Sequence, residues 1–232
     1  MIPQRMLLNR VPRTKKHTAF SVIADGTYSD EVKSMDFMYD YGDGLYFNLT
    51  NRCPCRCEFC IRSKVDALGS AENLWLKNEP SVDEVINAIC KIDLFAYKEV
   101  VFCGYGEPME RAQDVVEIAD FIRNNYALPV RMNTNGLGDL IQGRDTVDLM
   151  EGHLDAISIS LNASNSERYM ELCRPKFGED SYPAILDFAR RAVARFDDVT
   201  MSVVDVITPE EIEECRQIAK KIGAKFRVRG CY

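Results

Sequence analysis

Short apolar runs alternate with longer amphipathic stretches from Leu45 to the end of the chain. The short runs predict six strands, at residues 45–50, 99–103, 130–133, 156–161, 199–206 and 224–228. The longer stretches predict helices between them, at residues 81–94, 112–125, 164–173, 182–196 and 209–222. Strands that alternate with helices imply right-handed crossovers and a parallel sheet.

Six strand–helix units are too few for a closed eight-stranded barrel of roughly 250 residues. We therefore expect an α/β fold, a partial (β/α)6 barrel of the TIM type with parallel strands, over residues 44–232. Residues 1–43 lack a clear period and are predicted to form an N-terminal extension. In such sheets, functional groups gather where the strands end, so motifs at the strand ends carry most weight.

Composition narrows the possible functions. The apolar fraction of 46% and charged fraction of 28% are ordinary for a soluble domain, and no apolar run is long enough to span a membrane. The first sixteen residues are basic without an apolar signal region, so we expect a cytoplasmic protein. The net charge of -7 argues against nucleic acid as a partner. The only histidines are His17 and His153, too few for a multi-histidine metal site.

The chain has nine cysteines, and four of them lie within Cys53–Cys60. Such clustering is typical of metal or cluster ligation rather than disulfides. Cys53, Cys57 and Cys60 have the spacing C-x3-C-x2-C, which can hold three irons of a [4Fe–4S] cluster and leave the fourth open to a ligand. Cys55 could replace Cys53 or Cys57. A structural zinc site made of all four cysteines is the alternative, although zinc sites usually use two separated ligand pairs.

Polar residues and glycines follow the later strands. The segment Gly104-Tyr-Gly-Glu107 lets the backbone approach a small charged ligand closely; a dinucleotide fingerprint is a weak interpretation because Met109 replaces the third glycine. Asn133–Gly136 ends the next strand as a polar turn. Alternation then puts Ser158, Ser160 and Asn162 on one face, which we expect to line a polar cavity.

The cysteine spacing, with Phe59 before the last cysteine, resembles the radical S-adenosylmethionine (SAM) superfamily. The resemblance implies that the open iron chelates SAM. An electron from the cluster would then cleave the S–C5′ bond and give a 5′-deoxyadenosyl radical that abstracts hydrogen from an unidentified substrate.

The resemblance also implies roles for individual residues. The segment Gly104-Tyr-Gly-Glu107 matches the GGE-type motif that contacts the SAM amino group, with Tyr105 departing from the double glycine. The strand end at Ser160 and Asn162 would contact the SAM ribose or carboxylate. Arg174, which can clamp a carboxylate or remain on the surface, would approach the SAM carboxylate. The cofactor-binding set is therefore predicted to be Phe59, Gly104, Tyr105, Gly106, Glu107, Asn135, Ser160, Asn162 and Arg174.

Within the superfamily, the strand motifs look most like the TatD-associated radical SAM proteins. The electron would come from a reductant such as flavodoxin or ferredoxin. A small molecule or nucleotide would need a closed pocket, whereas a protein substrate, as for glycyl-radical activases, would need an open mouth. Two further alternatives are a non-catalytic iron–sulfur carrier or sensor, and a zinc-stapled module that binds partners through residues 1–16 or the basic run 220–229.

Overall fold

The computed structural model describes residues 21–22, 28–29 and 37–231. The basic arm at residues 1–16, His17 and most of the predicted extension therefore lie outside the described residues. Two short strands, β1 (Ser21–Val22) and β2 (Tyr28–Ser29), pair with each other in antiparallel fashion as a separate sheet.

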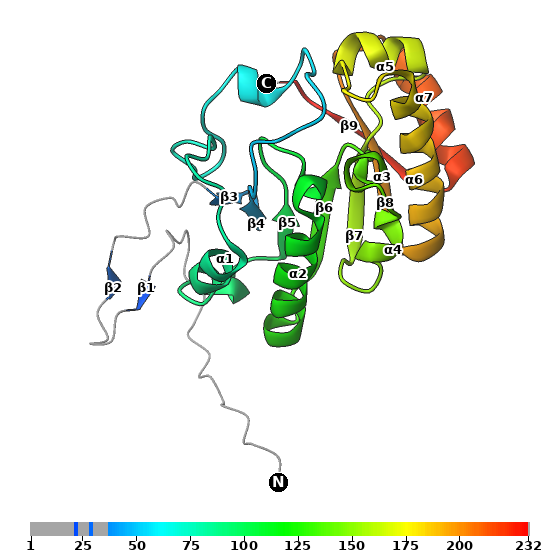
Figure 1. Cartoon of the computed structure of the whole chain (residues 1–232). Helices are drawn as coiled ribbons and strands as arrows, with labels where there is room; N and C mark the ends of the chain where they lie inside the picture. The colour runs from blue at the N-terminus through cyan, green and yellow to red at the C-terminus, as the bar shows by residue number, and fades with distance from the viewer. Residues whose placement is uncertain (1–20, 23–27, 30–36, 232) are drawn as a thin grey trace.

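The main sheet has seven strands in the order β3-β4-β5-β6-β7-β8-β9 (Figure 1). The strand bounds are β3 Met38–Tyr41, β4 Gly44–Phe47, β5 Glu99–Phe102, β6 Val130–Thr134, β7 Ala156–Ser160, β8 Asp198–Val204 and β9 Lys225–Arg229. Strand β3 is antiparallel to β4, and every later pairing is parallel. Because β3 and β9 do not pair with each other, the sheet is open and the partial (β/α)6 barrel is confirmed.

The sheet begins earlier than the sequence suggests. Strand β3 belongs to the segment assigned to the extension, and it enters the main sheet through a hairpin with a glycine at its tip. That glycine, Gly42, has a φ of +62°, a conformation that favours glycine. The tight turn pairs β3 with β4, so the main sheet begins at Met38, before the predicted boundary at residue 43.

Seven α-helices and four short 3₁₀ helices connect the described strands. The α-helices are α1 Val82–Ile89, α2 Ala112–Tyr126, α3 Gly138–Gln142, α4 Thr146–Met150, α5 Ser166–Cys173, α6 Ser181–Arg195 and α7 Pro209–Ile222. The 3₁₀ helices are η1 Ile61–Ser63, η2 Leu94–Ala96, η3 Pro108–Arg111 and η4 Gly178–Asp180. The sequence predicted none of α3, α4 or the 3₁₀ helices, because such short segments carry too few turns to show a period. Two of the predicted helices begin with capping boxes, Ser81 with Glu84 and Thr208 with Glu211.

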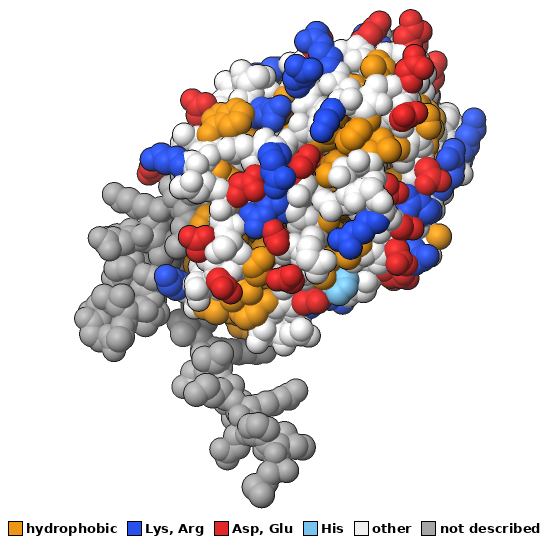
Figure 2. All heavy atoms as spheres, in the orientation of Figure 1, with side chains coloured by type: hydrophobic (Ala, Val, Ile, Leu, Met, Phe, Trp, Pro, Cys, Tyr) orange, Lys and Arg blue, Asp and Glu red, His pale blue; other side chains and the backbone are white. Residues whose placement is uncertain are grey.

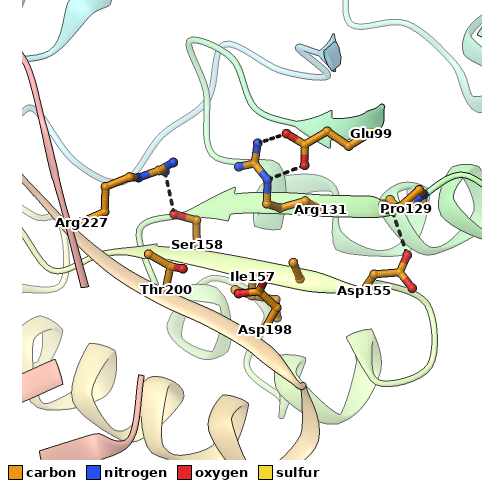
Figure 3. A pocket seen from close by; sticks show the side chains of 11 residues that line it. Glu99, Pro129, Arg131, Asp155, Ile157, Ser158, Asp198, Thr200 and Arg227 are labelled. Carbon is orange, nitrogen blue, oxygen red and sulfur yellow. Dashed lines mark hydrogen bonds and ion pairs between the residues drawn. The ribbon is translucent and has the colours of Figure 1, made fainter. Parts of the chain in front are cut away.

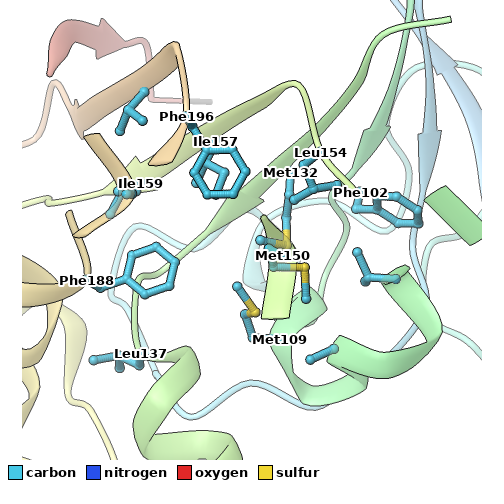
Figure 4. Packing of buried hydrophobic residues seen from close by; sticks show 14 of the residues in the cluster. Phe102, Met109, Met132, Leu137, Met150, Leu154, Ile157, Ile159, Phe188 and Phe196 are labelled. Carbon is cyan, nitrogen blue, oxygen red and sulfur yellow. The ribbon is translucent and has the colours of Figure 1, made fainter. Parts of the chain in front are cut away.

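The helices cover one face of the sheet, and the apolar core lies between the two layers (Figure 1). Met132 and Ile157 of neighbouring strands meet Phe188 of α6 and Met150 of α4 there, and all four are buried (Figure 4). Strand alternation sends the next residues to the opposite, concave face, which is lined by polar side chains. The helix layer therefore stabilises the sheet and leaves the concave face available for chemistry.

Candidate functional site

The cysteine-bearing loop follows β4 and is held by the end of α5. The Arg56 N–H donates to the Cys173 carbonyl at 2.9 Å, and the Glu58 N–H donates to the Leu172 carbonyl at 3.0 Å. A third backbone hydrogen bond, of 2.7 Å, runs from the Lys176 N–H to the Pro54 carbonyl. Segments far apart in sequence therefore fix the backbone on which the cysteines stand.

The four clustered cysteines are not equivalent. Cys53, Cys57 and Cys60 are half-buried, whereas Cys55 is 3% exposed and its Sγ lies 3.6 Å from the Tyr169 hydroxyl. This difference supports Cys55 as a packing residue and the other three as ligands. A hydrogen bond with Cys55, followed by burial, raises the pKa of the Cys53 thiol.

The loop also approaches other thiols. Cys57 interacts with the buried Cys173, and this contact is the largest cause of the raised pKa of Cys57. Within the described residues, no three Cys, His, Asp or Glu side chains are gathered so as to hold a single metal ion.

The Gly104-Tyr-Gly-Glu107 segment packs directly against the loop that leads to the cysteines. A Cβ on Gly104 would lie 2.1 Å from Oδ1 of Asn48, and a Cβ on Gly106 would lie 2.1 Å from the Thr50 carbonyl oxygen. The Glu107 N–H donates to the Arg52 carbonyl at 2.8 Å. Gly104 is therefore needed where the Asn48 side chain approaches, and Gly106 is needed where the two backbones approach each other.

Tyr105 extends the same contact outward. Its N–H donates to Oδ1 of Asn48 at 3.2 Å, its hydroxyl donates to the Val65 carbonyl, and its ring centroid lies 5.2 Å from that of Trp75. The segment that carries Trp75 is anchored to the β4 loop as well, since Asn48 Nδ2 donates to the Leu74 carbonyl at 2.6 Å. The ring of Tyr105, between the two glycines in sequence, thus packs against the ring of Trp75.

Glu107 is buried and its carboxylate accepts three hydrogen bonds. Oε1 accepts from the Thr134 hydroxyl at 2.6 Å and from the Met109 N–H at 3.2 Å, and Oε2 accepts from the Asn135 N–H at 2.7 Å. Burial raises the pKa of Glu107 to about 7, although these hydrogen bonds favour the charged form. The carboxylate therefore connects the end of β5 to the end of β6.

The ends of β6 and β7 bring the remaining predicted residues to the same edge. Asn135 Nδ2 lies 4.0 Å from the Cys55 sulfur. Ser160 Oγ and Asn162 Oδ1 accept hydrogen bonds of 3.3 and 3.2 Å from one nitrogen, Nη2 of Arg229. Asn162 Nδ2 in turn lies 3.8 Å from the Cys173 sulfur.

Arg174 and Phe59 complete the predicted set. Arg174 has a left-handed backbone conformation at the end of α5, its guanidinium pairs with Glu58, and its side chain is 58% exposed. The guanidinium therefore faces an acid of the cysteine loop rather than the concave face. Phe59 is half-buried and packs against the main core, where it helps to hold the loop.

A cavity of about 350 Å³ lies on the concave side, near the beginnings of β5 to β9 (Figure 3). Ser158 and Thr200 line it, whereas Ser160 and Asn162 of the predicted polar face are not part of its lining. Arg131 and Arg227 also line it; Arg131 pairs with Glu99 at 2.7 Å, and Arg227 donates to Ser158 Oγ at 3.3 Å. The sequence patterns did not single out these arginines, although alternation along β6 and β9 was a signal for them.

The face that carries the helices is different in character. Lys and Arg side chains alternate there with Asp and Glu (Figure 2). Arg191, for example, pairs with Asp139, Asp145 and Asp187. None of the helices in the described part of the chain is long and apolar enough to cross a membrane.

The residues present fit the predicted cofactors. Three half-buried thiols on one anchored loop supply three protein ligands, and thiolates are the usual ligands of iron–sulfur clusters. The adjoining polar strand ends offer backbone and hydroxyl groups to a SAM molecule.

Comparison with known proteins agrees with this geometry. The family model described as "Radical SAM superfamily" matches residues 47–222. Among curated proteins, a GTP 3′,8-cyclase of Paenarthrobacter nicotinovorans is 30% identical over 57% of this chain and 35% of its own length. A probable GTP 3′,8-cyclase of Thermococcus kodakarensis is 28% identical over 77% of this chain and 53% of its own length. The chain thus covers about half or less of each of these two relatives.

Solved structures share the fold. SuiB of Streptococcus suis, solved with S-adenosylmethionine bound, superposes with a TM-score of 0.56 at 18% identity, over 81% of this chain and 38% of SuiB. Methylornithine synthase PylB superposes with a TM-score of 0.57 at 13% identity, over 82% of this chain and 53% of PylB. At these identities the likeness concerns the fold alone.

Proposed function

Because the chain belongs to the radical SAM superfamily, whose enzymes use a [4Fe–4S] cluster and SAM, we propose that it forms a substrate radical on a nucleotide. The observation that carries the proposal is the arrangement of Cys53, Cys57 and Cys60 on an anchored loop beside the Gly104–Glu107 segment. Both lie at the carboxyl edge of the parallel sheet, where this fold class places its active sites.

Each part of this edge has a role in the proposal. Cys53, Cys57 and Cys60 hold three irons, and Cys55 packs beneath them. When bound, the cluster and SAM would supply the radical chemistry that removes a hydrogen atom from the substrate. The backbone of Gly104–Gly106 and the polar groups of Asn135, Ser160 and Asn162 orient SAM. Buried Glu107 acts as a positioning residue that holds two strand ends together.

The nucleotide substrate is proposed from the curated relatives, which are named as GTP 3′,8-cyclases. This chain covers their shared radical SAM region and only about half or less of their length. The cavity on the concave face is also polar, since Ser158, Thr200 and two arginines line it, but it lies near the beginnings of the strands and not at the edge that carries the cysteine loop. GTP is accordingly the first compound to test.

The experiment uses the anaerobically reconstituted full chain with SAM and a strong reductant. We expect 5′-deoxyadenosine to form faster with GTP than without it. We also expect ribose-deuterated GTP to transfer deuterium into the 5′-deoxyadenosine. ATP and guanosine test base and phosphate selectivity. Cluster formation without SAM cleavage under any condition would instead support a non-catalytic carrier, and SAM cleavage with no deuterium transfer from any nucleotide would reject the substrate.

Two finer assignments remain proposals. Membership of the TatD-associated group rests on the strand motifs described above, whereas both curated relatives carry the name GTP 3′,8-cyclase. A flavodoxin or ferredoxin as electron donor follows from the same chemistry. Reduction of the reconstituted protein by each purified donor, followed by EPR, tests this second assignment directly.

A further inference from the structure

Strand β9 presents a basic face to the concave side of the sheet. Its residues alternate, so Lys225, Arg227 and Arg229 share one face while Phe226 packs towards the core on the other. Arg227 and Arg229 reach across β8 to hydroxyl groups of β7, Ser158 and Ser160 respectively. The run that sequence alone presents as a solvated basic stretch is therefore part of the barrel lining.

The cations near the beginnings of the strands on this face are paired with acidic side chains, whereas Arg227 and Arg229 are not paired with any acidic side chain of residues 37–231. Lys225 pairs with Asp198 at 3.0 Å, and Arg131 is held by Glu99 through two hydrogen bonds. Across residues 37–231, neither Arg227 nor Arg229 forms an ion pair with an acidic side chain. Two positive charges on the concave face therefore lack a counter-charge from this part of the chain.

Arg229 carries a second sign of an absent partner. Its Nε is buried and has no hydrogen-bond acceptor, while Nη2 donates to Ser160 and Asn162. A buried donor without an acceptor is destabilising and rare, so the unpartnered Nε of Arg229 indicates a ligand that supplies an acceptor. An anionic oxygen is the acceptor that a guanidinium binds most strongly.

The spacing and surroundings suit an extended anion. Side chains two residues apart on a strand are separated by roughly 7 Å, which successive phosphate groups can bridge. Arg227 lines the cavity of about 350 Å³, and Arg229, two residues further along β9, donates to Asn162, whose Nδ2 lies 3.8 Å from the Cys173 sulfur. The end of β9 is close to that loop, since Lys64 Nζ lies 3.1 Å from the Cys231 sulfur.

We propose that Arg227 and Arg229 bind the phosphate groups of the nucleotide substrate on the concave face of the sheet. This inference rests on the proposed function, and it assigns the phosphate-binding residues that the function requires. Arg229 binds through its Nε, which lies on the same edge of the guanidinium as the Nη2 that donates to Ser160 and Asn162. Arg227 binds from a position two residues earlier on the same strand. Bidentate contacts of this kind are the reason for arginine rather than lysine at such sites.

The test measures binding to the reconstituted full chain by anaerobic calorimetry, with inorganic tripolyphosphate, GTP, guanosine and SAM as separate ligands. The variants are Arg227→Gln and Arg229→Gln, with Arg229→Lys as a charge-conserving change. Arg190→Gln is the matched control, because Arg190 is exposed on helix α6. Iron content and thermal unfolding of every variant confirm that the fold and the cluster are retained.

We expect tripolyphosphate and GTP to bind the unaltered chain, and each glutamine variant to weaken both by at least about tenfold. SAM affinity and guanosine affinity should not change, Arg229→Lys should be intermediate, and Arg190→Gln should have no effect. Equal tripolyphosphate binding by all variants, or no binding to the unaltered chain, would overturn the inference. A loss confined to SAM affinity in Arg229→Gln would also overturn it and assign that arginine to the SAM carboxylate.

The outcome separates this inference from the proposed function. If tripolyphosphate binding depends on both arginines but no nucleotide donates hydrogen, the anion site stands and the nucleotide substrate is wrong. If GTP supports turnover equally well in all variants, the substrate stands and the arginine assignment is wrong.

Discussion

The backbone N–H of Asn135 donates a 2.7 Å hydrogen bond to the buried carboxylate of Glu107. The bond joins the residue that ends the β5 motif to the first residue after β6. Together with the Thr134 hydroxyl, it holds two neighbouring strand ends at the edge where the cysteine loop lies. Glu107 therefore fixes the relative positions of the two strand ends that border the candidate SAM site.

The buried carboxyl makes stability depend on pH. Burial raises the pKa of Glu107 from 4.5 to about 7, so the folded protein binds a proton that the unfolded chain has lost between these values. The stabilisation is complete below about pH 4.5 and is lost as pH rises to about 7, a change of about 3 kcal/mol at most. Urea unfolding of the unaltered chain and of Glu107→Gln across this range measures it. A variant with the same pH slope would contradict the assignment.

Gly106→Ala should disturb the cysteine loop. Its Cβ would lie 2.1 Å from the Thr50 carbonyl oxygen and 2.7 Å from that of Arg52, and both atoms belong to the backbone. We expect a loss of about 1–3 kcal/mol in the free energy of unfolding and a lower iron content after reconstitution. Gly230→Ala is the control, because a Cβ there meets nothing within 4 Å. Equal iron content in the two variants would show that this close approach is not required.

The two central cysteines should respond differently to alanine. Cys55 is buried against Tyr169, so Cys55→Ala should cost about 1 kcal/mol of stability and keep the full iron content. Cys57→Ala should lose the cluster, because the remaining thiols leave a second iron open. Iron and sulfide analysis of both variants determines which cysteines are the cluster ligands. Cluster loss in the Cys55 variant alone would replace Cys57 by Cys55 in the ligand set.

Arg174→Gln should have little effect on either stability or SAM. The Arg174 side chain is 58% exposed and its ion pair with Glu58 is screened by solvent, so the expected loss of stability is within about 1 kcal/mol. Because the guanidinium faces Glu58, we also expect SAM affinity to stay unchanged. A large drop in SAM affinity, with folding intact, would restore Arg174 to the role implied by the resemblance.

The fold was largely predictable because its longer helices and strands show a clear spacing of apolar residues. The helix predicted at 209–222 has the bounds of α7, because Thr208 and Glu211 form its capping box and Pro209 stands at its first position. Strand β3 was not predicted, because Met38–Tyr41 is short and lies among glycine, tyrosine and aspartate residues. Its place in the sheet depends on the hairpin with β4, a contact that no local pattern reveals.

The candidate site was only partly predictable. The cysteine spacing identified the loop, but the burial of Cys55 by Tyr169 of α5 is a long-range contact. In the same way, Gly104 and Gly106 looked like ligand-facing glycines, whereas their lack of side chains is required by Asn48 and Thr50. The arginines of β9 were noted only as part of the basic run 220–229, because sequence does not say which face of an edge strand is concave.

The central claim is that Cys53, Cys57 and Cys60 hold a cluster that cleaves SAM. The most direct measurement compares the unaltered chain with Cys60→Ala after anaerobic reconstitution, by iron and sulfide content and by 5′-deoxyadenosine formed from SAM under reducing conditions. The account predicts a cluster and 5′-deoxyadenosine in the unaltered chain, and neither in the variant. Unchanged SAM cleavage in Cys60→Ala, or zinc without iron in the unaltered chain, would contradict it.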